Sequence, residues 1–398
     1  MTKPSLQLLL PAAKAIETEL IALRRQLHQN PELSLEEAET SASAARLLTK
    51  LELEVKRNIG GHGIVADLAG GRPGPLIALR ADMDALPIQE ESNLPFASAI
   101  PGKMHACGHD AHTAILYGAA KLLSERKDML AGSVRFIFQP AEEINAGAQA
   151  MIEEGVLVGV DEIYGLHNLP TLPVGKAATR HGALMGSVDR FEIIITGKGG
   201  HGAIPDQCVD PIVAASAVML SLQTAVSREI SPFEPVVVTV GSFHGGASYN
   251  VIPERAELTG TVRTFSRSVQ DAMPSKLQRL ISRTAEAHRC QAELRYTKMV
   301  PVLVNHDEQV RLVEEAIDLI QGAENRSEAA PVLAGEDFSN YLKHVPGCFF
   351  WLGSGPAMCA DQANGLYHPQ FLLNEECLPI GAALLAGIVL LRLGYANA

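Results

Sequence analysis

The chain has 398 residues, of which 47% are hydrophobic and 20% are charged, and its formal net charge at pH 7 is −12. This length exceeds one ordinary hydrophobic core, so two domains are expected. The acidic balance and the lack of a long Lys/Arg run argue against nucleic acid or an anionic membrane as the main partner.

The chain ends carry no clear targeting or membrane signal. The apolar run 8–10 is short and is broken by Pro11, which makes it a poor signal-peptide core. The apolar tail 382–391 is too short to span a bilayer. Six scattered cysteines without a C-x-x-C pair favour reduced thiols over a disulfide framework. We therefore expect a cytoplasmic protein.

The first part of the chain alternates helical and strand-like segments. Apolar spacing predicts a helix over 11–29, and Ser34 with Glu37 three residues later predicts a capped helix over 34–51. The strand-like runs are 63–68, 76–80, 133–139 and 162–166, and the helical stretches between them are 112–124 and 147–154. This alternation predicts an α/β sheet covered on both faces.

Three of the predicted strands end at polar side chains. Asp82 and Asp84 follow the second strand, the pair Glu142-Glu143 follows the third, and His167 follows the fourth. Open α/β sheets bind ligands beyond the carboxyl ends of their strands. We therefore expect these side chains to converge.

The segment Cys107-Gly-His109-Asp-Ala-His112 carries the strongest chemical signal. Cys107 and His109 are two residues apart, so both leave the same face of an extended stretch. Thiolate, imidazole and the carboxylates of Glu142-Glu143 together suit a borderline divalent ion such as Zn, Mn, Co or Ni. A carboxylate that is not a ligand would serve as a base toward water. Spacing leaves open which neighbouring histidine binds, and His368 is only a candidate on spacing alone.

The pattern changes near residue 187. Strands are predicted over 191–196, 236–240, 256–264 and 291–297, and helices over 211–226 and 271–288. This β-α-β-β-α-β order predicts a compact, ferredoxin-like α+β unit. We predict that 187–299 is inserted into a sheet-based catalytic domain formed by 1–186 and 300–398.

Residues 197–202 match the dinucleotide-binding pattern G-x-G-x-x-G directly after a strand, but the rest of that fingerprint is missing. Pro205 lies between the last glycine and the helix. No acidic residue occurs over 211–228, where the fingerprint requires the acidic residue that binds the ribose of the nucleotide. The glycines more plausibly let the backbone turn to present His201. The sequence contains no G-x-S-x-G motif and no Walker loop, which argues against a serine hydrolase and against an NTPase.

Several motifs, in order along nearly the whole chain, resemble the metal-dependent aminoacylase and carboxypeptidase family. They are Arg25-Gln-Leu-His28 with Pro31-Glu-Leu33, Leu79-Arg-Ala-Asp-Met-Asp-Ala-Leu-Pro87, Met104-His-Ala-Cys-Gly-His-Asp-Ala-His112, Gln139-Pro-Ala-Glu-Glu143, Gly165-Leu-His-Asn168, Gly199-Gly-His-Gly-Ala203, Tyr249-Asn-Val-Ile-Pro253 and Gly335-Glu-Asp-Phe338. The branch of hippurate hydrolases, bacterial N-acyl-amino-acid amidohydrolases and plant auxin-conjugate hydrolases is the most similar, because the Cys-Gly-His and Pro-Ala-Glu-Glu motifs are specific to it.

The resemblance implies a two-metal site and assigns its ligands. They are Cys107, His109, Glu143, His167 and His368. Cys107 stands where other branches have a metal-bridging Asp. Those branches carry His-x-Asp where this chain has Asp82-Met-Asp84, so Asp82 is not expected to be a ligand, and Asp84 is expected to orient one.

The resemblance also assigns the remaining site residues. It makes Glu142 the general base and His201 the residue that stabilises the oxyanion. Asn250 and Arg263 match positions that hold the free carboxylate of the substrate. Relatives dimerise through the inserted domain, so a homodimer is expected, with His201 acting in its own subunit or across the interface.

The implied activity is hydrolysis of a small N-acyl-L-amino acid, of the hippurate or N-acetyl type, by an enzyme with two divalent metal ions. A metallo-carboxypeptidase or dipeptidase of the same fold is the closest alternative. The rival classes are an NAD or redox enzyme, which the incomplete fingerprint argues against, and a non-catalytic binding relative, which the intact Glu142 argues against.

Overall fold

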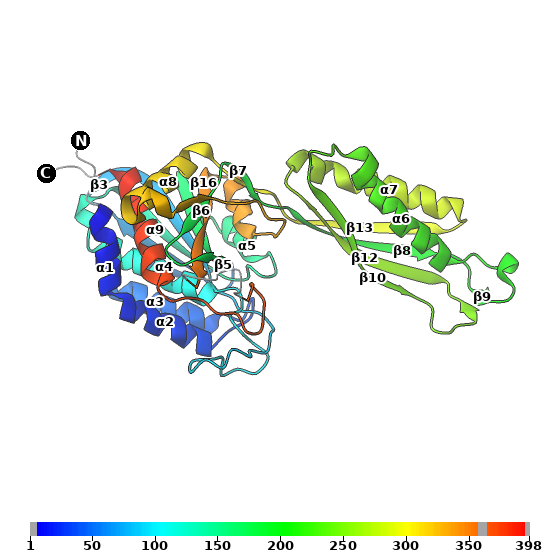
Figure 1. The fold of residues 1–398 in the computed structure, drawn as a ribbon, viewed down its shortest axis with the longest axis horizontal. Helices are drawn as coiled ribbons and strands as arrows, with labels where there is room; N and C mark the ends of the chain where they lie inside the picture. Colours follow the sequence, from blue (N-terminus) through cyan, green and yellow to red (C-terminus); the bar gives the residue numbers. More distant parts are fainter. Residues whose placement is uncertain (1–5, 357–363, 395–398) are drawn as a thin grey trace. The chain divides into compact units, whose positions relative to one another are not determined.

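The computed structural model describes residues 6–356 and 364–394, and these residues form two compact units (Figure 1). The larger unit comprises Met1–Leu184, Val304–Ala330 and Asp337–Ala398, and the smaller unit comprises Met185–Leu303 and Pro331–Glu336. The predicted α/β class with an inserted α+β unit is confirmed.

An eight-stranded sheet in the order β1-β2-β4-β3-β5-β16-β6-β15 forms the centre of the larger unit. Its strands are β1 (Glu54–Ile59), β2 (Gly63–Ala69), β3 (Arg72–Asp82), β4 (Ala131–Gln139), β5 (Glu162–Pro173), β6 (Ala177–Thr179), β15 (Arg326–Glu328) and β16 (Gly347–Gly355). The neighbours β4, β3, β5 and β16 run parallel. Their carboxyl ends therefore lie at one edge of the sheet.

Helices cover both faces of this sheet. They are α1 (Leu9–Ala15), α2 (Glu17–Gln29), α3 (Ala38–Lys50), α4 (His109–Ser124), α5 (Gly147–Glu153), α8 (Asp307–Gln321) and α9 (Cys377–Leu393), with 3-10 turns η1 (Leu6–Leu8), η2 (Lys127–Met129), η4 (Ala323–Asn325) and η5 (Asp337–Lys343). Phe136 and Phe138 of β4 face the core that includes α4 and α9. The other face meets α5 and η5, where Tyr341 contacts Met151.

Helices α4 and α9 are the most deeply buried helices of the larger unit, and they pack closely against each other. A Cβ atom at Gly118 of α4 would lie 2.9 Å from the Cβ of Ala382 on α9, so glycine permits this approach. Among the described residues, none of the helices, α9 included, combines the length and apolarity that a membrane crossing requires.

The helix predicted over 34–51 is observed as α3, but its predicted start and its capping box at Ser34 and Glu37 are wrong, because α3 begins only at Ala38. The Ser34 hydroxyl donates instead to Oδ2 of Asp84 at 2.6 Å. The carboxylate of Glu32 accepts from two amides in the first turn of α3 and takes over the capping role. The motif is thus used for tertiary contacts near the strand ends.

The smaller unit has an antiparallel sheet in the order β10-β12-β8-β13, with two helices on one face (Figure 1). Its elements are β8 (Val188–Thr196), β9 (Gly200–His201), η3 (Pro205–Gln207), α6 (Pro211–Glu229), β10 (Val236–Gly245), β11 (Val251–Ile252), β12 (Arg255–Thr264), α7 (Arg267–Ala287) and β13 (Gln291–Val300). The short strands β7 (Gly182–Met185) and β14 (Leu303–Asn305) form a separate two-stranded sheet.

Alternation along the strands explains why the helices cover only one face of this sheet. Phe191, Ile193 and Ile195 of β8 are fully buried, whereas the residues between them are not. Asp210 accepts from amides in the first turn of α6, and Pro211 occupies its first position. The predicted β-α-β-β-α-β order is the observed one.

Candidate metal centre

The candidate site lies at the carboxyl ends of β3 and β4 and beside His167, which lies in the middle of β5. The predicted convergence is therefore observed, but His167 does not follow its strand. Cys107 and His109 reach it from the start of α4. Gly108 between them has a φ of +95°. A Cβ atom there would lie 2.2 Å from the side-chain nitrogen of Asn168, so the sharp turn requires glycine.

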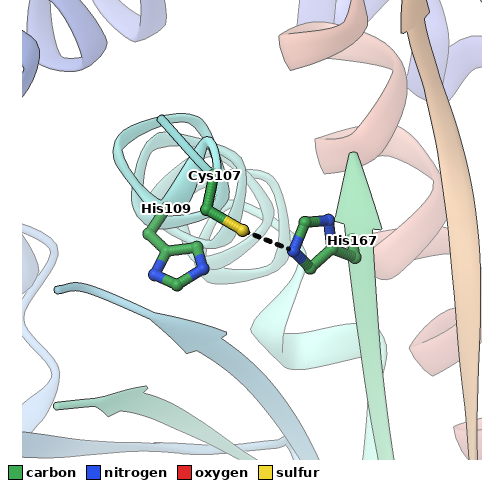
Figure 2. Close-up of side chains that lie close together, drawn as sticks. All are labelled: Cys107, His109 and His167. Carbon is green, nitrogen blue, oxygen red and sulfur yellow. Dashed lines mark hydrogen bonds between the residues drawn. The ribbon is translucent and has the colours of Figure 1, made fainter. Parts of the chain in front are cut away.

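Two overlapping groups of ligand-type side chains occur at this edge of the sheet. Atoms of Cys107, His109 and His167 lie within 4.8 Å of one another, as do atoms of His109, Glu142 and Glu143. Figure 2 shows the first group, with Nε2 of His167 3.2 Å from Sγ of Cys107. His109 belongs to both groups, so the two groups adjoin each other at the site.

Hydrogen bonds fix the tautomers of His109 and His167. Nδ1 of His109 donates to Oδ1 of Asp84 at 3.2 Å, because a carboxylate can only accept. Nδ1 of His167 donates to the carbonyl of Asn168 at 2.7 Å. Both rings therefore keep an Nε2 lone pair, the form in which histidine binds metals.

Two buried atoms of the site have no hydrogen-bond partner. They are Nε2 of His109 and Oε1 of Glu143, which lie 3.7 Å apart. Buried polar atoms are normally paired. Burial opposes protonation of His109, but the charges of Asp82 and Cys107 outweigh it and raise its pKa well above the ordinary value, so a cation bound here would take the place of that proton. The donor set of thiol, imidazole and carboxylate fits a borderline divalent ion.

His112 is excluded as a ligand by its own hydrogen bonds. Its Nδ1 donates to Asp82 at 2.6 Å, and its Nε2 accepts from the amide of Asn168 at 2.9 Å. Asp82 is also paired with Arg80 at 2.7 Å. Asp82, His109 and His112 are close enough to hold an ion, but two of the three have their atoms engaged.

His105, the other neighbouring histidine, is buried with both ring nitrogens unpartnered. Burial lowers its pKa to about 4, so the ring is neutral. It joins no ligand group among the described residues.

The local electrostatics favour a bound cation. Burial raises the pKa of the Cys107 thiol well above its ordinary value, and Glu143 adds to this shift. Burial also raises the pKa of Glu143. Burial opposes ionisation of Asp84, but hydrogen bonds from His109 and Ser34 outweigh it and lower its pKa. A divalent ion would stabilise the thiolate and carboxylate forms that burial disfavours.

The turn that carries Glu142 and Glu143 is held from two sides. Ala141 has a φ of +52°, a backbone conformation that residues other than glycine rarely adopt. Its amide donates to the carboxylate of the buried Glu37 at 2.8 Å. The amide of Glu143 donates to Asp84 at 3.0 Å. The sequence pattern suggested Glu37 as a helix cap, so its role at this turn was missed.

The structure does not bring His368 into the ligand groups. His368 is exposed and joins no such group among the described residues. Its neighbour Tyr367 instead reaches the site, where its hydroxyl forms a hydrogen bond with Glu143. Tyr367 directly precedes the candidate ligand His368 in the sequence, but the sequence analysis did not single it out.

The other predicted site residues belong to the smaller unit. His201 and Asn250 are adjacent, because β9 pairs with β11 and the amide of Gly202 donates to the carbonyl of Asn250 at 2.9 Å. Nδ1 of His201 accepts from the amide of Ala203 at 3.0 Å. Arg263 lies near the carboxyl end of β12, and its Nε donates to the hydroxyl of Thr261 at 3.0 Å.

Comparison with known proteins gives full-length matches. The pattern of peptidase family M20/M25/M40 matches residues 78–391. An N-acetylcysteine deacetylase of Bacillus subtilis is 44% identical over 96% of this chain and 99% of its own length. An IAA-amino acid hydrolase of Arabidopsis thaliana is 42% identical over 93% of this chain and 84% of its own. A crystal structure of a dinuclear metal-binding peptidase from Bacillus subtilis has a TM-score of 0.84, with 41% identity over 96% of this chain and 99% of that one.

The tautomers predict different effects for two histidines on α4. His109→Gln removes an unpartnered nitrogen from both ligand groups, so the purified variant should lose bound metal. His112→Gln removes only hydrogen bonds to Asp82 and Asn168, so it should keep its metal content. Elemental analysis after exhaustive buffer exchange gives the metal content, and the melting temperature checks that each variant is folded. Metal loss from a folded His112→Gln, with none from His109→Gln, would reverse the assignment.

Proposed function

The chain belongs to peptidase family M20/M25/M40 and is a metal-dependent amide hydrolase with two divalent ions, and on this premise we propose that it cleaves small N-acyl-L-amino acids. The products are a carboxylic acid and a free amino acid. The facing, unpartnered atoms of His109 and Glu143 beside the buried Glu142 carry this proposal. The names of the bacterial deacetylase and the plant hydrolase support the substrate class.

We propose five ligands in the larger unit. Four of them, Cys107, His109, Glu143 and His167, belong to the ligand groups, and the fifth, His368, is supported by the resemblance of its motif to the family. Asp84 keeps Nε2 of His109 free by accepting from Nδ1. When bound, two cations lower the pKa of a water and polarise the scissile carbonyl. The donor set suits Zn, Mn, Co or Ni.

Glu142 is the proposed general base. It is buried beside His109 and Glu143 and is not needed as a ligand once Glu143 is assigned. Its carboxylate takes a proton from the attacking water and delivers it to the leaving amine.

His201 is the proposed donor to the tetrahedral oxyanion. Because its Nδ1 accepts from the amide of Ala203, a neutral ring must carry its proton on Nε2. That nitrogen is then a hydrogen-bond donor without any protonation step, and such a donor contributes about 3–4 kcal/mol. The tautomer of His201 supports this role, because its proton is on Nε2, whereas the proton of His109 is on Nδ1.

Arg263 and Asn250 are the proposed anchors for the substrate carboxylate. Arg263 presents a planar, permanently charged guanidinium, and its Nε donates to the hydroxyl of Thr261. The chain is acidic overall, but surface charges farther than about 8–10 Å are screened, so a local cation dominates. A free α-carboxylate would then be part of what the enzyme recognises.

Glu142→Gln should lower kcat roughly 100- to 10,000-fold while leaving metal content unchanged, because the amide removes a base and not a ligand. Turnover of hippurate and of N-acetyl amino acids, with elemental analysis of the same sample, checks both halves. Glu153→Gln, an exposed carboxylate on α5, is the matched control. A metal-free or fully active Glu142→Gln contradicts the assigned role.

Masking the substrate carboxylate as an amide should reduce kcat/KM about 10- to 1,000-fold, because Arg263 loses its ionic partner. Arg263→Ala should erase the difference between hippurate and hippuramide by lowering activity on the acid alone. Arg190→Ala, at an exposed arginine on the adjacent strand β8, is the control. Equal rates of the native enzyme on acid and amide would refute the anchor, and preferred cleavage of dipeptides would favour the peptidase alternative.

We further propose a cytoplasmic homodimer. The described cysteines are all free thiols, which supports a reducing compartment that cell fractionation can check. Sedimentation equilibrium should give twice the chain mass. If His201 acts across the interface, mixing subunits of the inactive variants Glu142→Gln and His201→Ala should restore part of the activity, because one site then has both groups. A mass equal to that of one chain would contradict the proposed dimer.

A further inference from the structure

Asn168 follows the proposed ligand His167 on β5, and it is fully buried. Its side-chain nitrogen Nδ2 donates to the carbonyl of Cys107 at 2.6 Å and to Nε2 of His112 at 3.0 Å. Its side-chain oxygen Oδ1 accepts from the hydroxyl of Ser354 at 3.1 Å. Both ends of the amide are therefore engaged, and one of them binds the backbone of a second proposed ligand.

Asn168 contacts two proposed ligands that lie far apart in the sequence. Its backbone carbonyl accepts from Nδ1 of His167 at 2.7 Å, whereas its side chain binds the carbonyl of Cys107. Sγ of Cys107 and Nε2 of His167 lie 3.2 Å apart, although the two residues are separated by 60 positions (Figure 2). One residue thus ties together the two segments whose ligand atoms meet.

The turn at Gly108 is packed against the same side chain. A Cβ atom at position 108 would lie 2.2 Å from Nδ2 of Asn168 and 2.8 Å from its Cγ, so the backbone of the turn lies directly on the amide. This turn connects Cys107 to His109, the two proposed ligands at the start of α4. The amide therefore supports the turn that carries both of them.

The partners of this side chain require an amide. Nδ2 faces two acceptors, the carbonyl of Cys107 and Nε2 of His112, while Oδ1 faces a hydroxyl that donates. Nε2 of His112 is an acceptor because Nδ1 of that ring donates to Asp82. A carboxylate of the same shape would place an oxygen against both acceptors. An apolar side chain of similar size would leave them buried without this donor, which costs free energy.

We propose that the side-chain amide of Asn168 positions the metal ligands: it holds the backbone of Cys107 so that the thiolate and the ring of His167 face the same cation. Asn168 is a positioning residue, because it acts through these ligands and does not bind the cation itself. The inference rests on the metal site of the proposed function but not on its substrate. Metal affinity should therefore depend on an amide at position 168.

Metal binding to the apo-protein tests this without any turnover. Dissociation constants for Co²⁺ and Zn²⁺ are measured by competition with a chromogenic chelator for the native protein and for Asn168→Leu, which keeps the backbone bond to His167 but lacks the amide. Asn168→Leu should weaken binding of at least one ion about 10- to 100-fold, as loss of a residue that supports a ligand usually does. The thiolate-to-Co²⁺ charge-transfer absorption should decrease, because Cys107 is the ligand that moves. Unchanged affinity and an unchanged absorption spectrum overturn the proposal.

A second variant keeps the test decisive if Asn168→Leu does not fold. Asn168→Ala also lacks the amide, but it leaves space in which water can reach the polar partners. It should weaken metal binding in the same direction. A folded Asn168→Ala with native affinity for both ions would likewise overturn the proposal.

Two controls separate positioning from a general loss of stability. Asn305→Leu removes another buried amide of the larger unit, one that donates to the carbonyl of Phe349 at 2.9 Å and accepts from its backbone amide at 2.8 Å. This variant should lower the melting temperature of the apo-protein without changing its metal affinity. If Asn168 acts through Cys107, adding Asn168→Leu to Cys107→Ser should cost little further affinity, whereas independent effects would add.

Two outcomes of these controls contradict positioning through Cys107. One is an equal loss of affinity in Asn305→Leu, and the other is additive losses in the double variant. A native protein that passes the binding tests but cleaves no N-acyl amino acid would instead count against the proposed substrate.

Discussion

A neutral imidazole has one proton for two nitrogens, and the partner of Nδ1 therefore decides what Nε2 can do. At His109 and His167, Nδ1 donates to an oxygen, so Nε2 offers a lone pair to a metal. At His201, Nδ1 accepts from a backbone amide, so Nε2 of the neutral ring carries a proton and can donate. His112 has both nitrogens engaged. Histidines that look alike in the sequence are thus sorted into ligands, donors and structural residues by one local contact each.

The scaffold supplies these contacts at the ends of parallel strands. Asp84 follows β3 and Asn168 lies in β5, so the groups that set the tautomers come from the same sheet edge as the ligands. The buried Arg80 pairs with Asp82 at 2.7 Å and with Asp337 at 2.9 Å. The first of these ion pairs keeps the carboxylate of Asp82 engaged and away from the metal position. Breaking such a buried pair usually costs about 3–5 kcal/mol, because a charge is left uncompensated. The rigidity of the strand ends is therefore part of what makes the site.

The sequence predicted most of this site but not all of it. The two-residue spacing of Cys107 and His109 and the polar ends of the strands depend on local geometry, so their convergence could be foreseen. Ser34 and Glu37 fit a helix-capping rule equally well, yet one contacts Asp84 and the other the amide of Ala141. Tertiary contacts overrode a local preference, which happens most often at functional sites. The tautomers could not be foreseen either, because each depends on a hydrogen-bond partner that only the folded chain supplies.

The residues proposed to recognise the substrate belong to a different unit from the metal ligands. The larger unit holds the ligands and the base, whereas His201, Asn250 and Arg263 belong to the smaller unit. Within the smaller unit, Asn250 lies beside β9, whereas Arg263 lies near the carboxyl end of the ten-residue strand β12. At about 3.3 Å per residue, that strand is much longer than a carboxylate. One substrate carboxylate can therefore meet both proposed anchors only if one of them comes from the partner subunit of the proposed homodimer.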